Sequence, residues 1–95
     1  MNAITKSSME PEVKVGIDRF REACEQILAG IQLVIPQRPT GGAFLVSLSH
    51  EGFRTYSTIK EDDFADWGEE EAHPVMLKTA RDLIRKLLQG KEGHA

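Results

Sequence analysis

Apolar residues recur at steps of three and four along the first third of the chain. They fall at Val13, Ile17, Phe20, Cys24, Ile27, Leu28 and Ile31. This spacing is typical of one face of a helix with 3.6 residues per turn and predicts an amphipathic helix. Pro11 is favourable in the first turn of this helix, and Gly30 is favourable at its C-terminal end. Gly16 is a poor helix former, which favours a start of the regular part as late as Ile17.

The middle of the chain changes to short β-type segments. Residues 31–35 are apolar and β-branched and end at Pro36, and residues 43–49 and 53–59 flank a Ser-His-Glu-Gly turn. An even-numbered connection in this hairpin places Phe44 on the same face as Phe53 and Ile59. An odd connection would expose Phe53 and Ile59, because a slip of one residue moves every side chain to the opposite face. We therefore expect the even connection, with Leu45 and Tyr56 on the other face.

A second apolar stripe predicts a closing helix. It begins at His73-Pro74, ends at Gly90 and carries Met76, Leu77, Ala80, Leu83, Ile84, Leu87 and Leu88. The 95 residues leave room for one domain. The expected fold is α+β and two-layered, in the order α-β-β-β-α, with a three-stranded antiparallel meander and two helices on one face. Residues 10–90 form the domain, and 1–9 and 91–95 are expected to be disordered tails.

The α-β-β-β-α order is shared with double-stranded RNA-binding domains, but the residues that serve those domains are missing. The closing helix starts with His73-Pro74-Val75 rather than a basic cluster, and the segment before it is acidic. Order alone does not carry function, so no family is assigned.

No group of side chains predicts catalysis, a metal site or a cofactor. Cys24 lies on the apolar face of the first helix, where a small core residue is the expected role. His50, His73 and His94 lack the short spacing of metal ligands. Gly41-Gly42 opens a strand and lacks the surrounding phosphate-loop pattern. We therefore expect a protein that is not an enzyme.

The segment 61–71 is the unusual part of the sequence, with seven carboxylates in eleven residues and no basic residue. Phe64 and Trp67 are three apart, so one helical turn would place them on one side. In one interpretation they cap the core while the carboxylates stay solvated. In the other, the segment docks a protein with a basic surface. The docking residues would be Asp62, Asp63, Phe64, Asp66, Trp67, Glu69, Glu70 and Glu71.

The closing helix is basic, although the chain has a formal net charge of −3. Lys78, Arg81, Arg85 and Lys86 either form a solvated helix face or touch phosphates. The negative total charge argues against nucleic acid as the main partner. The single cysteine excludes an internal disulfide, and no apolar window approaches the length of a membrane span. A reducing cytoplasm is the expected compartment.

These observations lead to three hypotheses for function. The first is a small non-enzymatic interaction module that binds another protein, or a second copy of itself as a homodimer, through 61–71 or through an uncovered sheet face. The second is an inhibitor or nucleic-acid mimic of phage or plasmid type, whose carboxylates block a basic groove. The third is a weak nucleic-acid binder that uses the closing helix.

Overall fold

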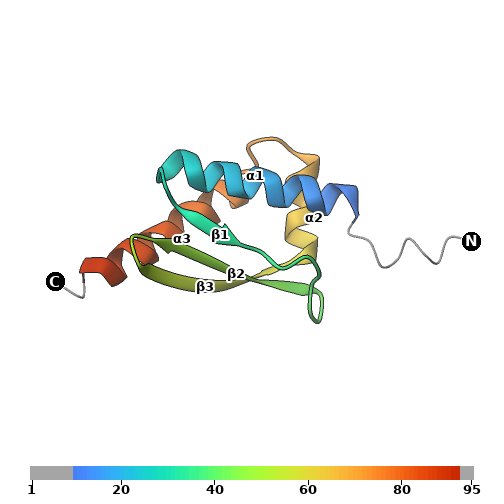
Figure 1. Cartoon of the computed structure of the whole chain (residues 1–95). Coiled ribbons are helices and arrows are strands. Elements are labelled where there is room, and N and C mark those ends of the chain that lie inside the picture. The colour runs from blue at the N-terminus through green and yellow to red at the C-terminus, as the bar shows by residue number, and fades with distance from the viewer. Residues whose placement is uncertain (1–9, 93–95) are drawn as a thin grey trace, which may run out of the picture.

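A computed structural model describes residues 10–92 and contains three helices and three strands (Figure 1). The elements are α1 (Pro11–Ile27), β1 (Gln32–Val34), β2 (Ala43–His50), β3 (Phe53–Lys60), α2 (Glu61–Glu69) and α3 (Pro74–Glu92). The predicted α+β meander is confirmed, and the acidic segment adds a helix of its own, α2. The predicted end of the closing helix at Gly90 is wrong, because α3 continues to Glu92. The predicted tail at 1–9, and residues 93–95 of the tail predicted at 91–95, lie outside the described residues.

The three strands form one antiparallel sheet in the order β1-β2-β3. Phe44 pairs with Ile59 and His50 with Phe53, so the predicted even connection is confirmed. The turn is shorter than the four residues expected, since only Glu51 and Gly52 join the strands. Both have positive φ, 53° and 87°, which a two-residue hairpin turn needs to match the right-handed strand twist.

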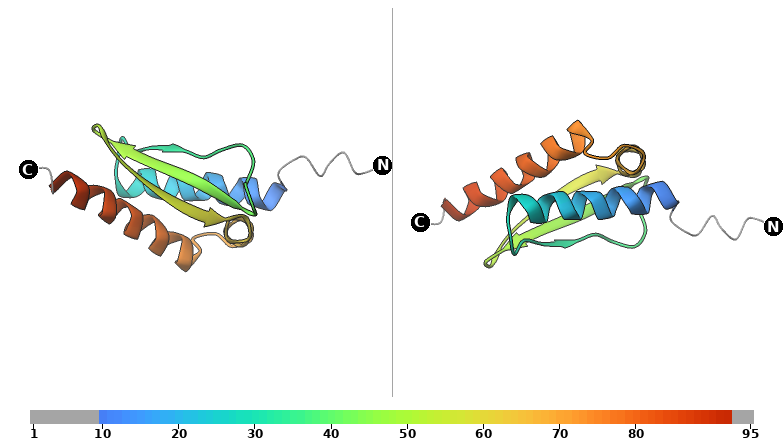
Figure 2. Two further views of the ribbon diagram at one scale, coloured as in Figure 1. Left: turned by 90° about the horizontal axis from the view of Figure 1, so that it is seen from below. Right: turned by 90° about the horizontal axis from the view of Figure 1, so that it is seen from above.

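All the helices lie on one side of the sheet. The view from below in Figure 2 shows the strands in front, α1 behind them and α3 alongside β3. The covered face buries alternate strand residues, namely Leu33, Phe44, Val46, Leu48, Thr55 and Ile59. The opposite face has no layer over it within residues 10–92. No helix in that range is long and apolar enough to cross a membrane.

Two glycines let α1 and α2 approach more closely than any other residue would allow. A Cβ at Gly16 would overlap the carbonyl group of Phe64, and a Cβ at Gly68 would overlap that of Glu12. The prediction that the regular helix starts at Ile17 is therefore wrong: α1 begins at Pro11, and Gly16 lies buried inside it. Gly68 likewise lies inside a helix, α2. At both positions, close helix packing outweighs the poor helix propensity of glycine.

Candidate functional site

The aromatic pair of the acidic segment belongs to the core. Phe64 is 0% exposed and Trp67 2% exposed. Trp67 stacks on Phe20 of α1 with ring centroids 5.6 Å apart, and Phe64 meets Phe44 of β2 edge-on at 5.5 Å. The two rings also contact each other edge-on at 5.2 Å. Four aromatic rings thus join α1, α2 and the sheet, and this cluster explains why an otherwise acidic segment folds back onto the domain.

Arg19 holds the end of α2 in place. Its Nη1 donates a hydrogen bond of 2.9 Å to the carbonyl oxygen of Trp67 in the last turn of that helix. A cation at a helix C-terminus satisfies a carbonyl that lacks an intrahelical donor and opposes the helix dipole. Phe64 and Trp67 are therefore unavailable as surface anchors, which corrects the expectation that they contact a partner. The interpretation in which they cap the core is the one that the structure supports.

The carboxylates of the segment remain as a charged surface. Asp62, Asp66 and residues 69–71 are exposed, whereas Asp63 is partly buried. Glu61, Asp62 and Asp63 occupy the first turn of α2, where negative charge is favourable next to the unpaired N–H groups. Part of the acidity thus has a local structural role. The residues that remain for binding are Asp66 and the run Glu69-Glu70-Glu71 at the other end of the helix.

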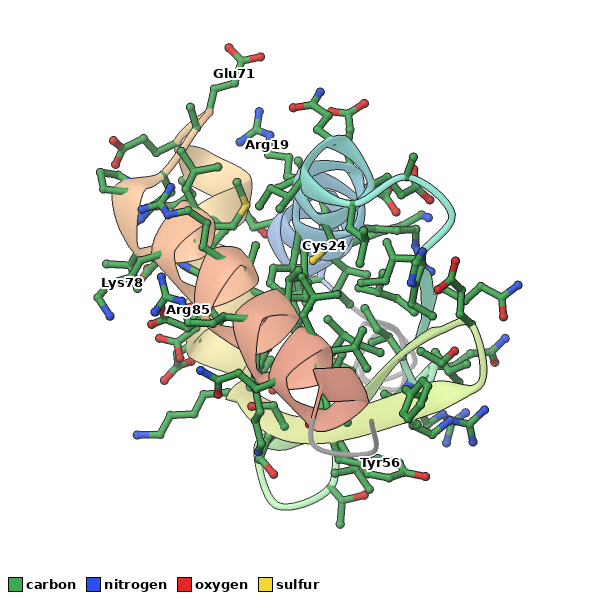
Figure 3. The ribbon with its side chains drawn as sticks, turned by 90° about the vertical axis from the view of Figure 1, so that its left-hand side faces the viewer. Arg19, Cys24, Tyr56, Glu71, Lys78 and Arg85 are labelled. Carbon is green, nitrogen blue, oxygen red and sulfur yellow. The ribbon has the colours of Figure 1, made fainter. Side chains whose placement is uncertain are left out.

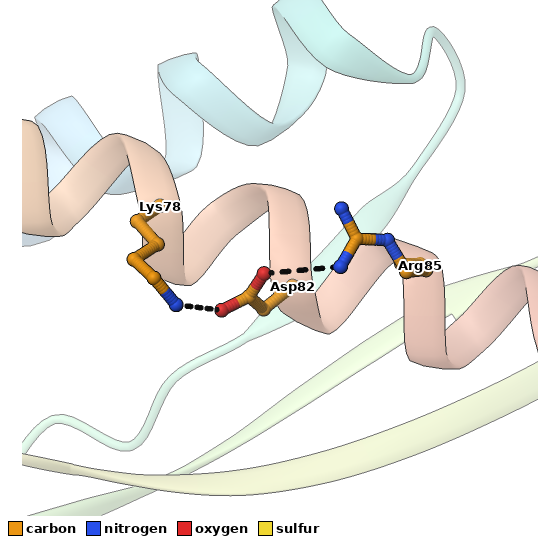
Figure 4. A network of polar contacts seen from close by, with 3 residues as sticks. All are labelled: Lys78, Asp82 and Arg85. Carbon is orange, nitrogen blue, oxygen red and sulfur yellow. Dashed lines mark hydrogen bonds and ion pairs between the residues drawn. The ribbon is translucent and has the colours of Figure 1, made fainter.

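Two of the basic residues of α3 form ion pairs with Asp82 of the same helix. Lys78 Nζ lies 2.8 Å from one Asp82 carboxylate oxygen, and Arg85 Nη1 lies 3.5 Å from the other (Figure 4). The hydrogen bond from Lys78, with the nearby positive charges, lowers the pKa of Asp82. Two of the four predicted phosphate contacts, Lys78 and Arg85, therefore share a carboxylate. Arg81 and Lys86 form no ion pair with another described residue.

Arg81 and Arg85 also border a hollow that the sequence did not reveal. Its volume is about 410 Å³, and it lies between the end of α1 and the second half of α3. The lining is completed by Ile27, Ile84, Leu88 and Gln89. An apolar floor next to two guanidinium groups suits an apolar chain that carries carboxylates. Phosphates are contacted by charged and polar groups, and only Arg81, Arg85 and Gln89 of this lining are of that kind.

The uncovered side of the sheet forms a second candidate surface. Val34, Leu45 and Tyr56 are 62%, 58% and 51% exposed and point away from the helices. Ser47 pairs with both Val34 and Tyr56, and Leu45 lies two residues along from Ser47. The three apolar side chains therefore surround one serine and form a continuous patch.

The charged side chains that the three strands contribute to this face are positive. Arg54 and Lys60 share its face on β3, and no strand contains an aspartate or glutamate. We call the surface formed by Val34, Leu45, Arg54, Tyr56 and Lys60 the open sheet face. The alternation of the strands indicated which residues would point this way. The expected two-layer arrangement, with the helices on one face, also predicted that this face would lack a covering layer.

Catalysis or metal binding could involve the cysteine, histidine and serine side chains. Cys24 is fully buried, and this burial raises the pKa of its thiol to about 12. Within residues 10–92 no cluster of histidine, cysteine and carboxylate side chains could hold a metal ion. A polar hollow of about 590 Å³ at the hairpin end includes Ser49 and His50. These two are consecutive strand residues and point to opposite faces, so they do not form a nucleophile–base pair.

Comparison with known protein families, with curated proteins and with solved structures finds no match to this chain. The two candidate surfaces, the open sheet face and the hollow beside α3, therefore have to be judged on their own geometry and charge.

Proposed function

We propose that this protein is a protein-interaction module whose docking surface is the open sheet face. The observation that carries the proposal is the exposure of Val34, Leu45 and Tyr56 together on the side of the sheet without helices. Isolated exposed apolar residues are ordinary, but a contiguous group on a flat, regular surface is typical of a binding site. Tyrosine and arginine, which frequently dominate binding energy, both lie on this face, as Tyr56 and Arg54.

The charge of the face specifies the partner's chemistry. Arg54 and Lys60 lie at the two ends of β3 with Tyr56 between them, and the strands provide no carboxylate to neutralise them. Two copies placed face to face would therefore bring four cations together, which disfavours that arrangement. The partner that fits is a protein surface with apolar side chains at its centre and carboxylates at its rim.

The test replaces the apolar patch and keeps the fold. Leu45→Thr and Tyr56→Thr retain residues that favour strands, and both side chains are exposed, so the double variant is expected to fold like the wild type. Val15→Thr is the matched control, because Val15 is 39% exposed but lies on α1. Circular dichroism melts of the three proteins verify that each is folded.

Each tagged protein is then expressed in its native cell, and the proteins that co-purify are quantified by mass spectrometry. We expect partners retained by the wild type and by Val15→Thr to be lost from the double variant. Retention of the same proteins in equal amounts by the double variant would contradict the proposal. So would the absence of any protein retained by the wild type.

A further inference from the structure

Each copy of this protein carries two surfaces of opposite charge at different places. The first is the hollow beside α3, which we call the basic hollow and define by Ile27, Arg81, Ile84, Arg85 and Leu88. The second is the acidic end, formed by Asp66, Glu69, Glu70, Glu71 and Val75. Figure 3 shows Glu71 projecting from the surface well away from Arg85.

The acidic end cannot reach the basic hollow of its own chain. Glu71 lies in the connection before α3, which begins at Pro74, whereas Arg85 lies eleven residues after Pro74 in that helix. A helix rises 1.5 Å per residue, which separates Pro74 from Arg85 by about 16 Å along the axis. Within one copy, the carboxylate that serves this part of α3 is Asp82, and it is shared between Lys78 and Arg85. Arg81 makes no ion pair with a described residue.

The two surfaces complement each other in chemistry as well as in charge. Ile84 forms the buried floor of the basic hollow, and Ile27 and Leu88 are partly exposed around it. The acidic end also offers an exposed apolar side chain, Val75, four residues after Glu71. An apolar contact inside the hollow, with carboxylates opposite Arg81 and Arg85, satisfies both features at once.

We propose that the acidic end of one copy docks in the basic hollow of a second copy, so that the protein self-associates head to tail. The two surfaces share no residue, so each copy can bind two neighbours. The interaction uses no residue of the open sheet face and does not depend on the function proposed above. Because the charges are exposed, salt should weaken the association.

Two variants each remove one surface. Arg81→Gln with Arg85→Gln removes the positive charge of the hollow. Glu69→Gln, Glu70→Gln and Glu71→Gln together remove three of the four negative charges of the acidic end. All these side chains are exposed, so both variants are expected to fold. Arg54→Gln with Lys60→Gln is the matched control: it also removes two positive charges, but from the open sheet face.

Sedimentation velocity over a range of protein concentrations measures the association. We expect the wild type and the control to form dimers and longer assemblies at about 50 mM salt, and to associate roughly tenfold more weakly at about 500 mM. Each surface variant alone should remain a monomer. An equimolar mixture of the two surface variants should form dimers and nothing larger, because one intact surface of each kind remains.

A monomeric wild type at low salt would overturn the proposal. So would a hollow variant that assembles as the wild type does, or a mixture of the two variants that stays monomeric. Loss of assembly in the control would show that self-association uses the open sheet face instead. Binding of an oligonucleotide that the hollow variant loses, with the wild type monomeric, would assign the arginines to nucleic acid.

Discussion

Replacing Gly16 by alanine tests the contact on which the whole helical layer depends. The added Cβ would lie 2.7 Å from the carbonyl carbon of Phe64 and still closer to its oxygen, whereas ordinary contact begins at 3.4 Å. The obstacle is the backbone of α2, which has no rotamer with which to move aside. The helices must therefore separate by about 1.5 Å, which loosens the contacts that Phe64 and Trp67 make with Phe20.

The expected magnitude combines two opposing effects. Overpacking of a tight site costs typically 1–3 kcal/mol, about 3 kcal/mol here because backbone is involved. Alanine recovers up to about 1 kcal/mol of helix propensity. The net loss in the free energy of unfolding is about 2 kcal/mol, which lowers the melting temperature of a domain of this size by roughly 10 °C. Gly68→Ala should behave in the same way, because its Cβ meets the backbone of Glu12.

Gly90→Ala is the matched control. Gly90 is also in a helix, but a Cβ there meets nothing within 4 Å, so only the propensity gain of up to about 1 kcal/mol applies. Thermal and urea unfolding followed by circular dichroism measure all three variants. If Gly16→Ala proves as stable as Gly90→Ala, α1 and α2 do not cross as closely as described.

Three further predictions concern single side chains. Trp67 is the only tryptophan, so native fluorescence should be blue-shifted and poorly quenched by acrylamide, and Trp67→Ala should lose about 3–5 kcal/mol of stability in urea unfolding. Cys24 should react with a thiol reagent at pH 8 only after denaturation. Its folded pKa of about 12 exceeds the ordinary 9.0, so stability should fall as the pH rises above 9, when the unfolded thiol ionises first. Asp82→Asn should weaken α3 slightly at pH 7 because Lys78 and Arg85 lose their partner. Since the pKa of Asp82 is lowered from 3.8, melts of the variant and the wild type should converge as the pH falls below 3.8, and identical melts at pH 7 would contradict the pairing.

The sequence by itself determined the order of the main elements and the pairing of the hairpin. Both follow from local repetition, because a helix and a strand bury residues at different periods and a hairpin register is set by the side chains that must share a face. The pairing of Phe44 with Ile59 is an example, since the alternative would have placed Phe53 and Ile59 in water. The same alternation indicated that Leu45 and Tyr56 would share the outer face.

Only the tertiary structure decided which of the unusual residues are available for binding. Phe64 and Trp67 could lie in the core or on the surface with the same spacing, and their contact with Phe20 and Phe44 settled the choice. From its helix propensity alone, Gly16 is unfavourable in a helix. Its role follows from the backbone of α2, which packs directly against it. The basic hollow joins Ile27 to α3, two segments far apart in the sequence. Periodicity reports how one element divides between core and solvent, whereas a surface built by several elements exists only after they pack together.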